Sequence, residues 1–492
     1  MIKQFLLALA ATCFSLSTLA EGVPPGVLKA LKSAQIPLSS VAIVVQPVDA
    51  RMPLLAHNAA SPMNPASVMK LVTTYAALDL LGPAWTWKTN AWIDSRPKNG
   101  RLDGNLYLQG SGDPRFAIEH LSALLRQLRV RGVTQIAGDV ILDRTVFNVP
   151  STDPGAFDDK PMRPYNVGPD GLLINFRALV FTLQGDSGKP RLLLETPSDG
   201  LRIDNRLRSG EGACSSDWKD QIAIRLVPEN NGDRLEFSGT YNALCGEKTL
   251  NLSPLPADAQ AGGLLRALWR ELGGTLDGRV RDGKVALGSQ LIARHESAPL
   301  ADAIRDINKF SNNVMARQVF LTLGNDATGR PADNLPPGET PPATAERARQ
   351  RISDWLDGRG LHFAELELEN GSGLSRHERI SAGSLNRLLQ DAWRHPLMPE
   401  FVSSLPIVGL DGTMKKRLNG SPVSGRAHIK SGTLDGVKAA AGYALDAEGH
   451  PWAFTFLINH PRAHAGGPAI DALLLWVAER RAGEKAPLLD SE

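Results

Sequence analysis

Apolar residues along this chain follow two different periods, which predict a mixture of strands and helices. A β-branched run at Val41–Val48 predicts a strand. A helix is expected to follow, with Asn64 as its cap and Gly82 at its end. Helical spacing returns over the segment Ala301–Leu323 and again over Pro468–Arg480. The chain is therefore expected to fold as an α+β protein.

The C-terminal third carries the period of two that is typical of strands. Three runs, Ala427–Lys430, Val437–Leu445 and Trp452–Asn459, are predicted to be consecutive strands. Leu361–Leu368 alternates apolar and acidic residues, so we expect a further strand whose glutamates face solvent. The final helix has one apolar face, which is expected to pack on the protein core and not on a membrane.

Between the first helix and the C-terminal third, the chain changes character. From residue 93 to residue 287, short strand-like runs are broken by Gly, Asp and Pro, and long helical repeats are few. We interpret 93–287 as a large, mainly β inserted region, and 190–254 as a candidate nested module. The flanking segments, 21–92 and 288–492, would then form a single domain that the insertion interrupts.

The N-terminus and the cysteines together indicate an exported protein. Residues 1–20 have one basic residue, an apolar stretch and a final Ala20, which is the layout of a cleavable signal peptide. We therefore expect a periplasmic or secreted protein of the cell envelope. The mature chain would keep Cys214 and Cys245, an even number that predicts a disulfide. Alternating apolar residues between them flank Asn230–Asp233, a pattern typical of a hairpin whose base the disulfide would clamp.

Composition narrows the classes of partner. The 492 residues include 54 Lys and Arg against 52 Asp and Glu, a net charge of +2. This balance, without a basic run, lacks the electrostatic footprint of a nucleic-acid-binding protein. After the signal, no apolar stretch approaches the roughly eighteen residues that a membrane-spanning helix needs. We expect no nucleic-acid partner and no integral membrane segment in the mature chain.

Ser67 and Lys70 form the first motif that can carry chemistry. A serine and a lysine three residues apart share one face of a helix, so the amine can reach the hydroxyl and act as its base. Unpaired N–H groups at the helix start favour a developing oxyanion. Such a base needs a lowered pKa, through burial or a nearby cation. The spacing alone is weak evidence, because Ser95 and Lys98 match it in a predicted loop.

Two further motifs distinguish Ser67 from the chance match. Ser311 and Asn313 form a Ser-x-Asn motif, and Lys430–Thr433 reads Lys-Ser-Gly-Thr at the end of a predicted strand. In this order the three motifs resemble the Ser-x-x-Lys, Ser-x-Asn and Lys-Thr-Gly set of the serine penicillin-recognising enzymes. The long interval before Ser311 further resembles the class C low-molecular-mass penicillin-binding proteins, which are D-alanyl-D-alanine carboxypeptidase/endopeptidases.

The resemblance implies a transpeptidase-like fold, an antiparallel sheet flanked by helices, and a role for each motif residue. Ser67 would attack the carbonyl between two terminal D-alanines, Lys70 would take its proton, and Ser311 would relay a proton to the leaving amine. Backbone N–H groups of Ser67 and Thr433 would form the oxyanion hole. The other implied binding residues are Asn313 for the substrate amide, Lys430, Ser431, Gly432 and Thr433 around the terminal carboxylate, and Asp143 and Arg376 for the rest of the peptide.

The resemblance also implies partners. Peptidoglycan stem peptides would be the substrates, and β-lactam antibiotics would be inhibitors that stall as acyl-enzymes. No zinc motif, dinucleotide loop or Gly-x-Ser-x-Gly elbow is found, so no metal and no cofactor are expected. The alternatives are a β-lactamase or esterase of the same superfamily, or a catalytically idle wall-binding protein. The chain departs from the family at Ser431, which keeps the hydroxyl of the usual threonine, and at Asn370, where Asp is common.

Overall fold

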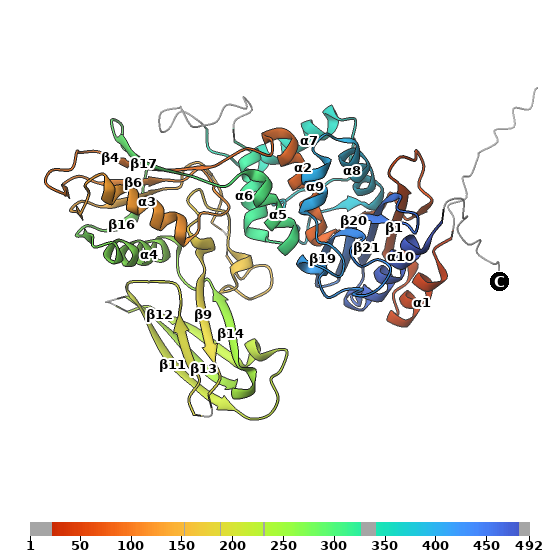
Figure 1. The fold of residues 1–492 in the computed structure, drawn as a ribbon, viewed down its shortest axis with the longest axis horizontal. Coiled ribbons are helices and arrows are strands. Elements are labelled where there is room, and N and C mark those ends of the chain that lie inside the picture. Colours follow the sequence, from red (N-terminus) through yellow and green to blue (C-terminus); the bar gives the residue numbers. More distant parts are fainter. Residues whose placement is uncertain (1–21, 152, 187, 230–231, 326–340, 482–492) are drawn as a thin grey trace, which may run out of the picture.

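The computed structural model describes residues 22–151, 153–186, 188–229, 232–325 and 341–481. The expected signal peptide at 1–20 therefore lies outside the described residues. The molecule is an elongated α+β protein in which a helix-covered sheet lies at one end and further sheets lie at the other (Figure 1). No helix of the described residues is both long and apolar enough to cross a membrane.

A five-stranded antiparallel sheet brings the two ends of the chain together. Its strand order is β19-β20-β21-β1-β2. The strands are β19 (Ala427–Leu434), β20 (Val437–Leu445), β21 (Pro451–Asn459), β1 (Val41–Pro47) and β2 (Leu55–His57). Alternate residues of β1 enter opposite cores, Val44 on one face and Val45 on the other. Val41–Val45 are all apolar because both faces of the sheet are covered.

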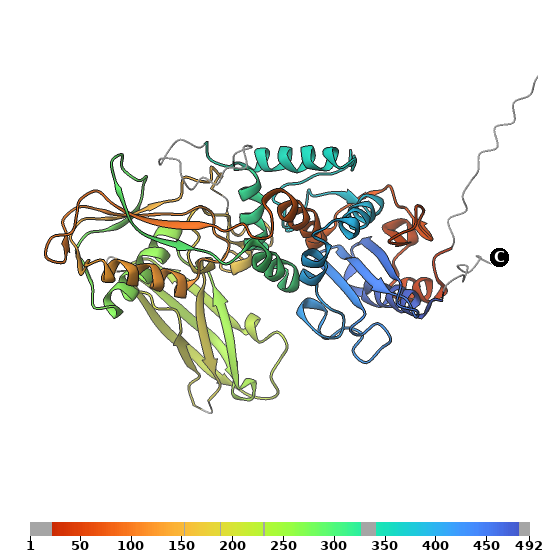
Figure 2. The same cartoon turned by 45° about the horizontal axis from the view of Figure 1, so that its top comes forward.

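Helices cover the two faces of this sheet. On one face, α1 (Pro25–Ala34) and α10 (Gly467–Glu479) lie side by side (Figure 2). The helices of the other core are α2 (Lys70–Leu81), α5 (Leu300–Phe310), α6 (Asn313–Leu323), α7 (Ala345–Gly358), α8 (Ala382–Arg394) and α9 (Met398–Ser404). A short pair, β3 (Pro62–Met63) with β18 (Ile380–Ser381), lies just before α2 and α8. The expected strands at both ends of the chain and the final helix are confirmed.

Two expected elements differ from the structure. The segment 301–323 is not one helix, because Ser311 adopts a left-handed conformation (φ 56°) and separates α5 from α6. Asn312 then caps α6 by accepting a hydrogen bond from the backbone of Met315. The strand expected at 361–368 is a loop. Its Glu365 does not face solvent freely but accepts hydrogen bonds from the Ser381 backbone and the Ser384 hydroxyl.

The inserted region contains a second five-stranded sheet, in the order β16-β8-β6-β4-β17. Its strands are β4 (Lys88–Ile93), β6 (Leu106–Gln109), β8 (Val140–Asp143), β16 (Val280–Asp282) and β17 (Gln290–Glu296). A small sheet of β5 (Arg101–Leu102), β7 (Gln135–Ile136) and β15 (Thr275–Leu276) and two helices, α3 (Ile118–Val130) and α4 (Ala257–Glu271), complete it. The sheet thus extends beyond 93–287 at both ends, and the division into domains stays a prediction.

Gln318 of α6 ties the insertion to the helices of the first sheet. Its side-chain amide donates to the carbonyl oxygens of Gly112 and Asp170 at 3.2 and 2.8 Å. Its side-chain oxygen accepts from the backbone of Asp170 at 2.8 Å. Because Gln318 is fully buried, these three bonds fix the insertion next to the helix that carries Asn313.

Two three-stranded sheets form the strand-rich part within the insertion. One contains β9 (Leu179–Gln184), β10 (Arg191–Leu194) and β14 (Glu247–Leu252), and the other β11 (Leu201–Gly210), β12 (Ile222–Val227) and β13 (Asp233–Asn242). β12 and β13 form the predicted hairpin, with Leu226 opposite Leu235; residues 230 and 231 of its turn lie outside the described residues. The predicted disulfide between Cys214 and Cys245 is confirmed.

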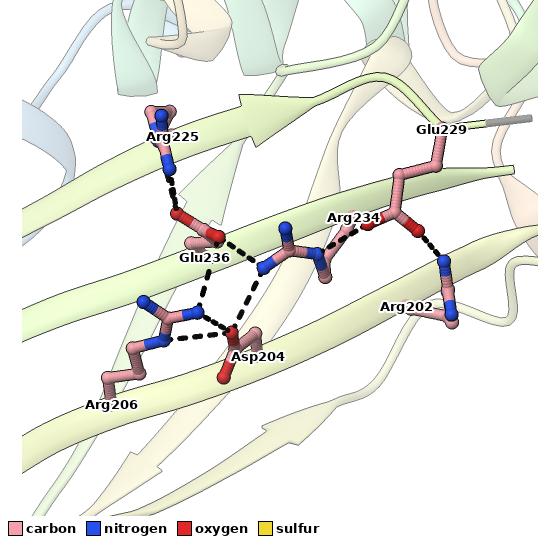
Figure 3. A network of polar contacts seen from close by, with 7 residues as sticks. All are labelled: Arg202, Asp204, Arg206, Arg225, Glu229, Arg234 and Glu236. Atoms are coloured by element: carbon pink, nitrogen blue, oxygen red, sulfur yellow. Dashed lines mark hydrogen bonds and ion pairs between the residues drawn. The ribbon is translucent and has the colours of Figure 1, made fainter.

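A ladder of charges covers one face of the β11-β13-β12 sheet (Figure 3). Its members are Arg202, Asp204, Arg206, Arg225, Glu229, Arg234 and Glu236. Glu236 lies on the central strand and accepts from arginines of both neighbouring strands, Arg206 at 3.5 Å and Arg225 at 2.6 Å. Because opposite charges face one another across the strands, we assign this ladder to strand pairing and not to a site.

Candidate active site

Ser67 lies on a 3₁₀ turn, Ala66–Met69, that leads directly into α2. Asn64 organises this turn, because its side-chain oxygen accepts from the Ala66 backbone at 2.8 Å and its amide donates to the Ser375 carbonyl at 2.8 Å. Ala66 has a left-handed conformation (φ 47°), which is rare for a residue with a Cβ. Ser67 is partly exposed while Ala66 is buried, so the hydroxyl is accessible from a rigid turn.

Lys70 joins the first two motifs. Its Nζ donates to the Ser67 hydroxyl at 2.9 Å, to the Asn313 side-chain oxygen at 2.6 Å, and to the carbonyl oxygen of Ser372. The lysine is fully buried. Burial lowers the pKa of Lys70 well below its ordinary value, and the cations of Lys430 and Arg317 lower it further. A buried lysine next to a serine hydroxyl can therefore serve as a general base.

Lys430 joins the second and third motifs. Its Nζ donates to the Ser311 hydroxyl at 2.9 Å and to the Ser431 carbonyl at 2.7 Å. Burial lowers the pKa of Lys430 to about 7. The three sequence motifs thus meet in one place, where each serine hydroxyl accepts a hydrogen bond from its own lysine.

Gly432 allows the edge strand β19 to approach Ser67. A Cβ atom at this position would lie 2.6 Å from the Pro65 carbonyl oxygen and 3.1 Å from the backbone nitrogen of Ser67. The absence of a side chain therefore brings the backbone of β19 against the turn of Ser67. Thr433 follows at the exposed end of this contact.

Two hydroxyl groups line β19 beyond the lysine. The Ser431 hydroxyl lies 3.0 Å from that of Thr413, and the Thr433 hydroxyl accepts from Lys438 Nζ at 3.1 Å. Lys438 stands directly opposite Thr433 on β20 and is partly exposed. Lys438 was not predicted from the sequence, because a polar residue within an alternating strand carries no signal that distinguishes it from an ordinary surface lysine.

The loop from Asn370 to Arg376 also packs against the turn that carries Ser67. Gly373 has a left-handed conformation (φ 76°) and packs against the backbone of Ala66 and Ser67. Asn370 holds the loop by accepting from the Ser372 backbone at 3.0 Å. Glu378, which was also not predicted from the sequence, has a buried carboxylate that accepts from the backbone of Asn370 and Gly371.

Arg376 lies at the edge of a cleft and Asp143 does not. Arg376 donates to the Asp435 carbonyl at 2.9 Å, and its guanidinium lies over the ring of Phe157, 4.8 Å from its centre. Arg376 and Phe157 border an open cleft of about 580 Å³ between the insertion and the loop. The buried Asp143 instead accepts from Thr145 and from the Val285 backbone within the insertion, so the structure does not bring it to the other site residues.

The described part of the chain holds no candidate metal site. Within it, no group of three or more His, Cys, Asp or Glu side chains is arranged to hold a metal ion. The polar groups around Ser67 are hydroxyls, an amide and cationic side chains, which are not the ligand set of a metal centre.

Comparisons with known proteins agree with the geometry. The model of the D-Ala-D-Ala carboxypeptidase 3 (S13) family matches residues 27–480. A D-alanyl-D-alanine carboxypeptidase of an Actinomadura species is 27% identical over an alignment of 460 positions that covers 88% of this chain and 80% of the relative. The D-alanyl-D-alanine carboxypeptidase DacB of Haemophilus influenzae is 25% identical over 425 residues, 86% and 85% of the two chains.

A solved structure supports the fold. The crystal structure of penicillin binding protein 4 from Haemophilus influenzae matches with a TM-score of 0.73 and 23% sequence identity. The match covers 91% of this chain and 98% of that chain. The predicted fold class, an antiparallel sheet flanked by helices with a large inserted region, is therefore confirmed.

Proposed function

Because this chain belongs to the D-Ala-D-Ala carboxypeptidase 3 (S13) family, we propose that its three motifs hydrolyse peptidoglycan stem peptides through an acyl-enzyme on Ser67. The family match confirms the resemblance to the class C low-molecular-mass penicillin-binding proteins, and the enzyme is a serine-type carboxypeptidase. One observation carries the assignment of the nucleophile: Lys70 Nζ lies 2.9 Å from the Ser67 hydroxyl and is fully buried.

Acylation follows from this contact. Neutral Lys70 accepts the proton of Ser67 as the hydroxyl oxygen bonds to the carbonyl carbon between the two terminal D-alanines. The tetrahedral intermediate collapses when its carbon–nitrogen bond breaks. The departing amine takes a proton from the Ser311 hydroxyl, which Lys430 replenishes across their 2.9 Å hydrogen bond. Water then hydrolyses the ester: Lys70 returns its proton to the Ser67 oxygen as the ester bond breaks, and the proton that the water loses restores Lys430 through Ser311.

The developing negative charge needs donors beside the nucleophile. We assign this role to the backbone N–H groups of Ser67 and Thr433, because Gly432 lets β19 pack against the Ser67 turn. Each donor of an oxyanion hole stabilises the transition state by about 3 kcal/mol. The amide nitrogen of Asn313 is directed to the substrate backbone, since its oxygen already accepts from Lys70.

The terminal carboxylate of the substrate belongs at the end of β19. There it meets the hydroxyls of Ser431 and Thr433, with the charge of Lys430 behind them. Lys430 is fully buried, whereas Lys438 is partly exposed and already reaches the Thr433 hydroxyl. We therefore add Lys438 as the solvent-accessible cation of this subsite.

The remote part of the stem peptide is assigned to the cleft at Arg376. The cleft opens beside the loop that packs on Ser67, and its volume of about 580 Å³ leaves room for an extended peptide. Because it is open to solvent, a cross-linked peptide can enter as well, which supports endopeptidase activity in addition to carboxypeptidase activity. Asp143 has no place in this proposal, because its contacts lie within the insertion.

The same site accounts for the expected inhibitors. A β-lactam presents an acyl carbon and a carboxylate to Ser67 and to the end of β19, and it stalls as an ester. A β-lactamase would hydrolyse this ester and turn over many β-lactam molecules. The number of β-lactam molecules hydrolysed by each enzyme molecule therefore distinguishes a β-lactamase from a DD-carboxypeptidase. A location in the periplasm or outside the cell rests on the predicted signal peptide.

The test of the proposed function is the release of D-alanine from a peptide ending in D-Ala-D-Ala. The mature chain is expected to release one D-alanine for each peptide, and penicillin is expected to block the release. A Ser67→Ala variant should release none. Release by this variant, or no release by the unaltered protein, would contradict the proposal.

A further inference from the structure

Glu378 is a fully buried carboxylate that takes no part in the proton transfers of acylation. Its Oε1 accepts three consecutive backbone N–H groups, from Glu369 at 3.2 Å, Asn370 at 3.0 Å and Gly371 at 2.9 Å. Its Oε2 is buried without a hydrogen-bond partner among the described residues. A buried carboxylate oxygen without a hydrogen-bond partner lowers the stability of the folded protein, and this cost points to a functional role for Glu378.

The turn that Glu378 holds is in direct contact with the nucleophile helix. Its Gly371 carbonyl accepts from the Thr73 hydroxyl at 2.7 Å, and its Ser372 carbonyl accepts from Lys70 Nζ. Thr73 and Lys70 lie three residues apart on α2, so two successive carbonyl oxygens of the turn accept hydrogen bonds from one face of the helix. The carboxylate of Glu378 fixes the N–H side of this turn while the helix fixes the carbonyl side.

Charge adds a second connection between Glu378 and the base. The charged groups that face Lys70 are Lys430 from β19, Arg317 from α6 and Glu378 from the loop before β18. The two cations lower the pKa of Lys70, and Glu378 opposes them. Glu378 also faces Arg317, which is partly exposed. Burial raises the pKa of the Glu378 carboxyl, whereas its three backbone N–H partners and Lys70 lower it. The carboxylate thus lies near three basic side chains, of which Lys70 and Lys430 are fully buried.

We infer that Glu378 is a positioning residue for the base: it aims the Ser372 carbonyl at Lys70 and supplies the anion that opposes Lys430 and Arg317. This inference rests on the proposed role of Ser67 and Lys70. It also accounts for the departure at Asn370, since the carboxylate absent at that position is supplied by Glu378, which accepts from the Asn370 backbone.

The test is the pH dependence of acylation by penicillin in the full mature chain, with Glu378→Gln as the variant. Acylation requires neutral Lys70, so its rate rises with pH through the pKa of Lys70. Removing the charge of Glu378 removes an interaction that raises this pKa. The acidic limb of the profile is therefore expected to move to lower pH by about one unit. An acidic limb at the same pH as in the unaltered protein would overturn the inference, because a purely structural defect lowers the acylation rate equally at every pH.

Glu365→Gln is the matched control. Glu365 also accepts a backbone N–H and a hydroxyl, from Ser381 and Ser384, but it is not among the groups that face Lys70. The control is expected to leave the acidic limb unchanged. A shift of the limb in Glu365→Gln as large as that in Glu378→Gln would contradict a specific role of Glu378.

Glu378→Asp keeps the inference testable if the glutamine variant does not fold. Aspartate keeps the charge but withdraws the carboxylate from the three N–H groups by one methylene. The acidic limb should remain in place while the maximal acylation rate falls about tenfold. A maximal rate equal to that of the unaltered protein would overturn the positioning role. Failure of the unaltered protein to form an adduct at Ser67 would instead contradict the proposed function.

Discussion

Gly373 packs so closely against Ser67 that a Cβ atom at position 373 would lie 2.7 Å from the backbone nitrogen of Ser67. Gly432 approaches the same nitrogen from β19, where a Cβ atom would lie 3.1 Å away. Two segments distant in sequence thus converge on the N–H group that we assign to the oxyanion hole. The absence of side chains at both positions is therefore part of the catalytic geometry.

Gly373→Ala is expected to lower the rate of acylation by penicillin by at least about 100-fold, the scale of losing one oxyanion-hole donor. The added methyl group would overlap the Ala66 carbonyl, and a φ of 76° strains any residue with a Cβ. The control is Gly358→Ala at the end of α7, where a Cβ would meet open space. Acylation by Gly373→Ala at the rate of the control would contradict the assignment.

Lys430 predicts an alkaline limit to activity. Burial lowers the pKa of Lys430 to about 7, so its cation is lost as the pH rises through this value in the free enzyme. The ratio kcat/KM for a D-Ala-D-Ala peptide should therefore rise while Lys70 loses its proton and fall above about pH 7. The profile is measured by D-alanine release, with circular dichroism to verify that the protein stays folded. A rate that keeps rising from pH 7 to about pH 9 would contradict the role of the Lys430 cation.

Lys438→Met tests the carboxylate subsite. For a peptide with a free terminal carboxylate, kcat/KM is expected to fall about tenfold, mostly through KM, which corresponds to about 1.4 kcal/mol. For the same peptide with a terminal amide, the variant and the unaltered protein should be equal, because no charge is there to bind. Lys416→Met removes an exposed lysine elsewhere and serves as the control. An equal loss of kcat/KM with both peptides would show that Lys438 does not bind the terminal carboxylate.

The disulfide is expected to stabilise the insertion without affecting catalysis. Cys214 and Cys245 are 31 residues apart, and closing a loop of this length stabilises by about 3–4 kcal/mol in the chain-entropy model. Replacing both by serine should lower the urea concentration at which β12 and β13 lose their protection from amide hydrogen exchange, while the acylation rate stays constant. A loss of acylation in the folded variant would show that the insertion contributes to the site.

The sequence predicted those parts of the site that depend on local spacing. Ser67 and Lys70 share one helical turn, so their contact follows from the chain alone. The pairing of Ser311 with Lys430 needed the resemblance to a family, because these residues lie 119 positions apart. Glu378 and Lys438 were missed, since only packing shows that one is fully buried and that the other reaches Thr433.

Two fold predictions were wrong for reasons of backbone geometry. The apolar spacing is helical on both sides of Ser311, because α5 and α6 each bury one face in the same core. It therefore conceals the left-handed Ser311 that turns the chain between them. The alternation over 361–368 resembled a strand, but the capping bonds that Glu365 accepts from Ser381 and Ser384 hold it as a loop.

The central claim is that Ser67 is the nucleophile, and intact-mass measurement with peptide mapping after incubation with penicillin tests it most directly. One intact penicillin should be added for each chain, on the peptide that contains Ser67. Ser67→Ala should carry no adduct, whereas Ser95→Ala, which alters the chance match to the motif, should carry the full adduct. An adduct on any other residue, or one that persists in Ser67→Ala, would contradict the account.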